Sequence, residues 1–238
     1  MMTNQTSLRK IKKKLFEQFK ASDYYSALDD IRNLKPLQIV NLLFSLILST
    51  DSRVKWNAVL SMGVVTRKIA EEDRESARNI LRRLMWNLND ESGGIGWGSP
   101  EAMGEIISGS DFLVHEFLPI LISYLREDGN YQENEIMQRG VLWGIGRVCM
   151  VYPDEVISYK QYFLPYLNSV DQGVRGLSAW IIGLLRLEEA AQTLEKLLDD
   201  ESEFETFMNN RVINGKVREF ASEALEKIDI VHPLSAKN

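Results

Sequence analysis

A glycine preceded by a large apolar residue recurs along the chain at nearly regular intervals. The four copies, each with another apolar residue nine positions before the glycine, are Met62-Gly63, Met103-Gly104, Ile145-Gly146 and Ile182-Gly183. A fifth copy, which ends at Leu225-Glu226, keeps the apolar pattern without the glycine. The intervals are 41, 42, 37 and 43 residues. Self-similarity with this period predicts an array in which each repeat is one pair of helices.

The remaining apolar residues follow helical spacing, and no segment shows the sustained alternation that is typical of strands. We therefore predict an all-α fold without a sheet. The first helices of the pairs (A helices) are predicted at residues 37–49, 73–88, 111–126, 154–168 and 190–200. The second helices (B helices) are predicted at residues 52–70, 99–108, 134–151, 171–187 and 209–228. Pro119 and Pro165 lie inside predicted A helices, where proline should kink the helix rather than end it.

The fourth copy, DQGVRGLSAWIIGLLRLEEAAQTLEKLLDD, resembles the HEAT-like repeat named for phycobilisome lyases. Asp171, Val174-Arg175 and Ile182-Gly183 stand at the family's positions, and Ser178 replaces its usual alanine. The segment SGGIGWGSPEAMGEI is also similar to a group of uncharacterised bacterial HEAT-repeat proteins. The resemblance implies a right-handed α-α superhelix of the HEAT/armadillo type, whose B helices line a concave face. We expect one structural domain with three parts: an N-terminal helical cap (1–35), a solenoid of five helix pairs (36–229) and a tail (230–238).

The charge of the chain is unevenly distributed. The net charge is −6, but residues 1–20 carry +5 and the remaining residues therefore carry −11. A general grip on nucleic acid needs clustered lysines and arginines along the phosphates, so the acidic body makes nucleic acid an improbable partner without excluding it. The basic helix at residues 7–20 is either a solvated face or a contact for an anionic surface.

The rest of the composition favours an intracellular binding protein over an enzyme. No apolar run reaches the ~20 residues of a membrane span, and the first residues lack the apolar core of a secretory signal. The single Cys149 can form no internal disulfide, which fits a reducing cytoplasm. His115 and His232 belong to no motif with metal-ligand spacing. We expect no cofactor, no metal and no catalytic residues, and leave the oligomeric state open.

The glycine register also defines a second stripe on each B helix. Positions seven and three before the glycine, and one after it, are four residues apart and share a helix face. Four of the five tryptophans fall on this stripe, one in each glycine-bearing repeat. Tryptophan and arginine are enriched where binding energy concentrates. The candidate binding residues on the concave face are Trp56, Trp97, Glu101, Glu105, Arg139, Trp143, Arg147 and Trp180.

Two explanations of this stripe remain open. In the structural explanation, Glu101 and Glu105 neutralise Arg139 and Arg147 between adjacent helices, and the tryptophans fill spaces between repeats. In the functional explanation, the same charged residues and Trp143 form one contiguous surface that receives a partner. Both can hold together, because ion pairs can preorganise a groove.

The segment from Met85 to Ile106 contains four glycines in six residues: Gly93, Gly94, Gly96 and Gly98. Ser99-Pro100-Glu101 then has the order N-cap, first-turn proline and first-turn acid, which predicts the start of a helix. The glycine N–H groups could hold an anion there. However, no strand precedes the glycines and no Lys-Ser/Thr follows them, so both nucleotide-loop signatures fail. The alternative is a tight loop that lays Trp97 against its neighbours.

Three functions are compatible with these patterns. The first is a non-catalytic binding or scaffold module whose concave Trp/Glu/Arg face binds a protein or peptide. The second is an enzyme, because DNA glycosylases that remove alkylated bases also have HEAT-like architecture of about this length, with concave aromatic, acidic and arginine residues. The third is chromophore handling, suggested by the name of the repeat alone. Salt-dependent DNA binding would separate the first two.

Overall fold

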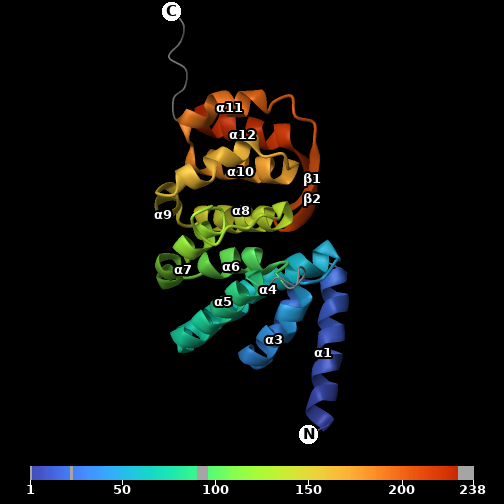
Figure 1. The fold of residues 1–238 in the computed structure, drawn as a ribbon. Helices are drawn as coiled ribbons and strands as arrows, with labels where there is room; N and C mark the ends of the chain where they lie inside the picture. Colours follow the sequence, from blue (N-terminus) through green and yellow to red (C-terminus); the bar gives the residue numbers. More distant parts are fainter. Residues whose placement is uncertain (1, 22–23, 90–95, 230–238) are drawn as a thin grey trace, which may run out of the picture. The chain divides into compact units, whose positions relative to one another are not determined.

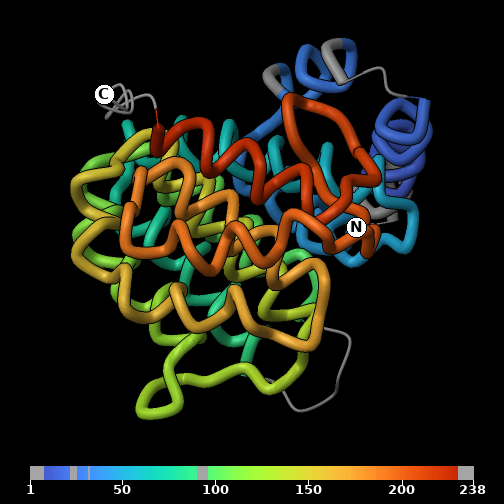
Figure 2. The backbone as a smooth tube through the Cα atoms, turned by 90° about the horizontal axis from the view of Figure 1, so that it is seen from above, coloured from blue at the N-terminus to red at the C-terminus, as the bar shows by residue number. Residues whose placement is uncertain are grey.

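The computed structural model describes residues 2–21, 24–89 and 96–229. They form two compact units, which divide between Leu113 and Val114. Figure 1 shows the elements of each unit, and Figure 2 shows the same backbone from above. Among the described residues, no helix combines the length and apolar composition that crossing a bilayer requires.

Unit 1 begins with two helices, α1 (Met2–Lys20) and α2 (Tyr24–Arg32). Leu15 and Phe19 on the apolar stripe of α1 are buried, while the basic face is exposed to solvent. The Asn57 side chain donates to the carbonyl of Phe19 at 3.0 Å, which fixes α1 against the fourth helix. In the sequence, Asp23 is a candidate N-cap for a second helix that runs to about Leu34, but Asp23 lies outside the described residues. The sequence pattern thus correctly located two helices before the repeats.

Two helix pairs follow: α3 (Pro36–Leu46) with α4 (Ser52–Glu72), and α5 (Arg74–Leu88) with α6 (Ser99–Ile107). Aspartates cap two of these helices, since Asp51 accepts from the first N–H groups of α4 and Asp73 accepts from Glu75 in α5. The helix α6 packs against both α4 and α5. The four predicted helices therefore match the structure to within a few residues at each end.

Unit 2 contains the third B helix and all later elements, and α7 (Asp111–Ser123), with Pro119 in its interior, leads into it. Its long helices are α8 (Glu135–Cys149), α10 (Gln172–Leu185) and α12 (Val217–Asp229). The B helices stack in order, because α10 packs against α8 on one side and α12 on the other. Asn134 caps α8 and Asp171 caps α10 through side-chain oxygens.

The last two A helices are less regular than predicted. In place of one helix over 154–168, the chain forms α9 (Pro153–Ile157) and two 3₁₀ turns, η1 (Lys160–Tyr162) and η2 (Leu164–Asn168). The expectation that Pro165 would kink a continuous helix was wrong. Proline cannot donate to an interior helical hydrogen bond, and here it lies in the first turn of η2. The fifth A helix is shortened to η3 (Glu188–Ala190) and α11 (Ala191–Lys196).

The prediction of a fold without any sheet was also wrong. The strands β1 (Glu203–Met208) and β2 (Arg211–Lys216) form an antiparallel hairpin. Its turn and β2 occupy the region assigned to the start of the fifth B helix, and β1 lies in the connection before it. Asn209 and Asn210 form its two-residue turn with φ values of 52° and 60°. Such turns need positive φ at both positions, which asparagine tolerates. The hairpin runs alongside α8 and α10 (Figure 1), with Phe204 in contact with Gly176.

The glycine register marks close approaches between consecutive B helices. A Cβ atom at Gly63 would lie 2.6 Å from Cγ of Glu105, and one at Gly183 would lie 2.7 Å from Cα of Ala224. At Gly146 the ring of Trp180 occupies the same space. The recurring glycine therefore permits close packing of consecutive B helices at these three positions. The cost of glycine within a helix, ~1 kcal/mol relative to alanine, is thus offset by contacts that a larger residue would prevent.

Candidate functional site

The predicted stripe residues of unit 1 form a largely buried polar cluster. Trp56 is 5% exposed, Glu101 is 6% exposed and Glu105 is 8% exposed. The Lys55 ammonium lies 2.9 Å from Glu101 Oε1 and 4.4 Å from the centre of the Trp56 ring. Because Glu101 is buried, this pair stabilises a carboxylate that would otherwise be costly to remove from water. Lys55, which was not a predicted site residue, is therefore the structural partner of Glu101.

Trp97 differs from these residues because it is 40% exposed. It lies in a turn just before α6, where Gly98 has φ of 74° and serves as the N-cap. A side chain at Gly98 would meet the carbonyl of Ile47 at 2.5 Å, so both the positive φ and the close approach require glycine. Ser99, predicted as the N-cap, is instead the first residue of α6. Gly93 and Gly94 of the predicted anion loop lie outside the described residues.

Most of the candidate binding residues in unit 2 form contacts between repeats. Arg139 forms two hydrogen bonds with Asp171, from Nε at 2.7 Å and from Nη2 at 2.5 Å. Asp171 also caps α10, so one carboxylate joins the third and fourth repeats. Burial opposes ionisation of Asp171, but the hydrogen bonds from Arg139 and from backbone N–H groups outweigh it and lower its pKa.

A second arginine–aspartate pair lies one repeat later, although its aspartate does not cap a B helix. Arg175 of α10 donates to Asp200 from Nε at 2.9 Å and from Nη2 at 2.6 Å. Asp200 in turn accepts from the backbone of Ser202, and its carbonyl accepts from Arg218 N at the start of α12. The structure therefore contains a ladder of arginine–aspartate pairs between consecutive repeats, which the spacing of the glutamates alone does not reveal.

The tryptophans of unit 2 play different parts. Trp143 is only 3% exposed, and its Nε1 donates to the carbonyl of Phe207 in the hairpin at 2.7 Å. Trp180 is half-buried against Gly146, and Arg147 is also half-buried. The hairpin thus covers Trp143, while parts of Arg147 and Trp180 remain accessible to solvent.

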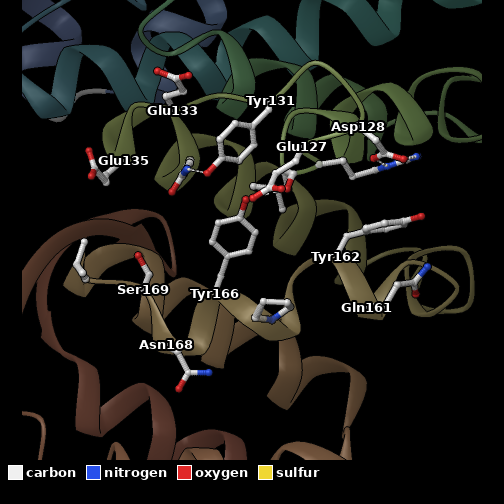
Figure 3. A pocket seen from close by; sticks show the side chains of 15 residues that line it. Glu127, Asp128, Tyr131, Glu133, Glu135, Gln161, Tyr162, Tyr166, Asn168 and Ser169 are labelled. Carbon is white, nitrogen blue, oxygen red and sulfur yellow. Dashed lines mark hydrogen bonds and ion pairs between the residues drawn. The ribbon is translucent and has the colours of Figure 1, made fainter.

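A pocket of about 690 Å³ lies elsewhere in unit 2, among residues that the stripe does not include (Figure 3). Its walls are the segment after α7, the start of α8 and the turns η1 and η2. The lining contains four carboxylates and three tyrosines: Glu127, Asp128, Glu133, Glu135, Tyr131, Tyr162 and Tyr166. Arg126 is the only lysine or arginine in the lining, and it pairs with Asp128 at 3.0 and 2.8 Å.

The repeat pattern did not predict this pocket. The connection from Glu127 to Glu133 interrupts the regular repeat, and its acidic residues and tyrosine are visible in the sequence. The other wall of the pocket is formed by η1 and η2. It was not predicted, because Tyr162 and Tyr166 were assigned to a regular A helix over residues 154–168. The tryptophans of the B helices formed a simpler pattern, which favoured the stripe as the candidate site.

Within the described ranges, no group of three or more histidine, cysteine, aspartate or glutamate residues is arranged to hold a metal ion. Cys149 is buried, and burial raises the pKa of its thiol to about 12. This cysteine is therefore protonated and unreactive in the folded protein.

Comparison with known proteins supports the fold. No protein-family model matches the sequence. An uncharacterized protein of Archaeoglobus fulgidus is 27% identical over 136 residues, which are 56% of this chain and 66% of that protein, just under two thirds of its length. A designed armadillo repeat protein in complex with the peptide (KR)4 is similar in structure, with 18% identity, coverage of 94% of this chain and 92% of that chain, and a TM-score of 0.52.

An engineered protein gives a TM-score of 0.53 with 16% identity, and the comparison covers 97% of this chain and 93% of that chain. At these identities the likeness concerns the fold alone. The chain has the all-α helical-repeat fold of the HEAT/armadillo class, with the β1–β2 hairpin as an insertion before its last helix.

Proposed function

We propose that this protein is a non-catalytic repeat module that binds a protein or peptide partner through the B-helix stripe. The observation that carries the proposal is that Arg147 and Trp180 keep solvent-accessible surface on α8 and α10 of unit 2, and that Trp97 keeps it in the turn before α6 of unit 1. Exposed tryptophan and arginine are typical of residues that anchor a partner. The designed armadillo protein with the same fold was solved with a bound peptide, which agrees with this use of the architecture.

The buried members of the stripe have a supporting part in this proposal. Trp56, Glu101 and Glu105 in unit 1 and Arg139 and Trp143 in unit 2 are held by packing, ion pairs or hydrogen bonds. A surface whose side chains are already fixed loses less conformational entropy on binding. The ion pairs of these residues differ from the expected ones, because Glu101 pairs with Lys55 and Arg139 pairs with Asp171. A packing role for the buried residues is nevertheless compatible with a binding role for the accessible ones.

The experiment is a pull-down from the source cell with four tagged proteins: wild type, Trp97→Ala, Arg147→Ala and Trp180→Ala. We expect the same partner to be lost or depleted in all three variants. Trp86→Ala is the matched control, because Trp86 is 75% exposed on α5 and lies outside the stripe. Identical partner lists for wild type and the three variants, with circular dichroism showing intact folds, would contradict the proposal. A salt-sensitive affinity for DNA would instead favour the glycosylase-like alternative.

The finer family assignment belongs to the same proposal. The three residues that match the phycobilisome-lyase type of HEAT repeat have structural roles that support this assignment. Asp171 caps α10, Arg175 pairs with Asp200 of the next repeat, and Gly183 packs against Ala224 of α12. A cytoplasmic location, suggested by the lone buried cysteine, is proposed with it. Fluorescence microscopy of the tagged protein in its source cell tests the location.

A further inference from the structure

The acidic pocket of unit 2 is held in shape by hydrogen bonds on both sides. The segment after α7 is anchored to the end of that helix, since Asn130 N donates to Ser123 O at 3.0 Å and Gln132 N donates to Tyr124 O at 3.0 Å. On the other side, Arg175 donates to the carbonyls of Ser169 and Val170. The volume, about 690 Å³, lies in the range of pockets that hold ligands.

The charge in this pocket is unbalanced. Asp128 is neutralised by Arg126, which leaves Glu127, Glu133 and Glu135 as the other carboxylates of the lining. Within residues 2–21, 24–89 and 96–229, the structure pairs no lysine or arginine with any of these three glutamates. Burial first, and then neighbouring Tyr131 and Glu127, raise the pKa of Tyr166. Its hydroxyl stays protonated and donates to Leu125 O at 2.8 Å.

A buried amide adds an acceptor to the same pocket. Gln138 is 5% exposed, and its Nε2 donates to Tyr131 Oη at 3.3 Å and to Gln132 O at 2.8 Å. Both amide hydrogens are thus used within the protein. Within the described part of the chain, the hydrogen bonds of this side chain are those that its Nε2 donates. The lining also carries donors in Gln161, Asn168 and Ser169, but its charges without an opposite partner are all negative, so the recognising group of a ligand should be a cation with N–H bonds.

The tyrosines favour a planar cation over a compact one. Arg126 already stacks its guanidinium on the ring of Tyr162, with 4.7 Å between Cζ and the ring centre. Tyr131, which is 39% exposed, offers another ring beside Tyr166 (Figure 3). A guanidinium can stack on such rings and donate to a carboxylate at the same time, whereas an ammonium is more strongly hydrated.

The rim of the pocket indicates a macromolecular ligand. Val170 lines the pocket and is 89% exposed, and Ile136, directly after Glu135, is 55% exposed. Apolar side chains at the edge of a charged pocket gain from contact with an apolar neighbour of the bound cation. A peptide supplies both groups on adjacent residues, and a small polyamine supplies only the cation.

We propose that this pocket binds an extended peptide segment of a partner protein in which an arginine stands beside an apolar residue. The carboxylates of Glu127, Glu133 and Glu135 and the oxygen of Gln138 accept from the guanidinium. Tyr131 stacks on it, and Val170 contacts the apolar neighbour. This site shares no residue with the B-helix stripe, so it can be tested independently of the function proposed above.

The test is fluorescence anisotropy with a fluorescein-labelled hexapeptide of alternating arginine and leucine. We expect saturable binding that weakens as NaCl rises from about 50 mM to about 500 mM. The double variant Glu127→Gln, Glu133→Gln should raise Kd about tenfold. The matched control is Glu195→Gln, Glu226→Gln, which removes the same charge from exposed positions of α11 and α12 and should leave Kd unchanged. Tyr131→Leu should weaken binding, and Tyr131→Phe should restore it.

Several results would overturn this proposal. An equal loss of peptide affinity in both double variants would show that the net charge of the protein alone attracts the peptide. Equal affinity for a lysine–leucine hexapeptide would contradict recognition of a guanidinium, and displacement by spermine at the affinity of the peptide would assign the pocket to a polyamine. Self-association that disappears in the Glu127→Gln, Glu133→Gln variant would assign it to the basic helix α1 of a second copy. Circular dichroism of each variant confirms that the fold is retained.

Discussion

Alanine at Gly183 would place a methyl group between two helices that have no space for it. An ideal Cβ there lies 2.7 Å from Ala224 Cα and 2.9 Å from Ala224 Cβ, both in α12. Ordinary contacts between carbon atoms begin near 3.5 Å, so α10 and α12 would have to separate by roughly 1 Å. The atom in the way belongs to the backbone, and no rotamer change can remove it.

Two opposing effects determine how much Gly183→Ala changes the free energy of unfolding. Overpacking of this kind costs about 1–3 kcal/mol, whereas alanine gains ~1 kcal/mol over glycine within a helix. The net expectation is a destabilisation of about 1 kcal/mol. If the contact were absent, the substitution would instead stabilise the protein by a similar amount, so the sign of the change is diagnostic.

Urea unfolding followed by circular dichroism measures this change, provided that the m-value stays constant. The reverse substitution, Ala224→Gly, supplies a double-mutant cycle. It removes one of the two clashing atoms, so the double variant should be more stable than the sum of the single changes by at least ~0.5 kcal/mol. A more stable Gly183→Ala variant, or additive single changes, would refute the close-packing explanation.

Three further predictions concern unit 2. Trp143→Phe should destabilise the protein by about 1–3 kcal/mol, measured by urea unfolding, because the buried carbonyl of Phe207 loses its donor. The lowered pKa of Asp171 means that its ionisation contributes stability above the unfolded pKa of ~3.9, and this contribution is lost as pH falls through the lower folded pKa. The free energy of unfolding should therefore fall less steeply with decreasing pH in Asp171→Asn than in wild type. Identical pH profiles of the two proteins would show that Arg139 does not hold this carboxylate. Cys149 should react with a thiol reagent only after urea unfolding, and rapid labelling of the native protein would contradict its burial.

The repeat register predicted most of the helical architecture because it reports packing directly. A glycine on a B helix is required where the next B helix approaches, so Gly63, Gly146 and Gly183 mark three of these interfaces in the sequence itself. The same register placed the starts of two B helices, which the structure shows capped by Asp51 and Asp171. These signals are local, and a local signal can be read from one sequence.

The hairpin was missed because the repeat alignment extended the last B helix too far toward the N-terminus. Glu203 and Glu205 are exposed and Phe204 and Thr206 are buried, which is the alternation of a strand. The Asn209-Asn210 pair marks its turn. Both signals are present in the sequence. However, the alternating segment is short, and the repeat alignment assigned the adjacent residues to a helix.

The candidate site was harder to predict because charge partners are chosen by tertiary contacts. Helical spacing placed Arg139 on a face with glutamates of another repeat as possible partners. It could not show that the N-cap Asp171, which is 32 residues away in sequence, lies within reach. The pocket around Tyr166 depends on two irregular segments, and periodicity carries no information about such segments.

The arginine–aspartate ladder has a direction along the chain. Arg139 reaches forward to Asp171, and Arg175 reaches forward to Asp200. The N-terminal part of a protein leaves the ribosome first during synthesis. Each arginine of the ladder has therefore left the ribosome before its partner aspartate does. The fourth and fifth repeats thus each bring an aspartate to an arginine that has been synthesised before it. Gene duplication at the C-terminal end can add a repeat to this ladder without altering those already present, whereas loss of an inner repeat leaves the next aspartate without its arginine.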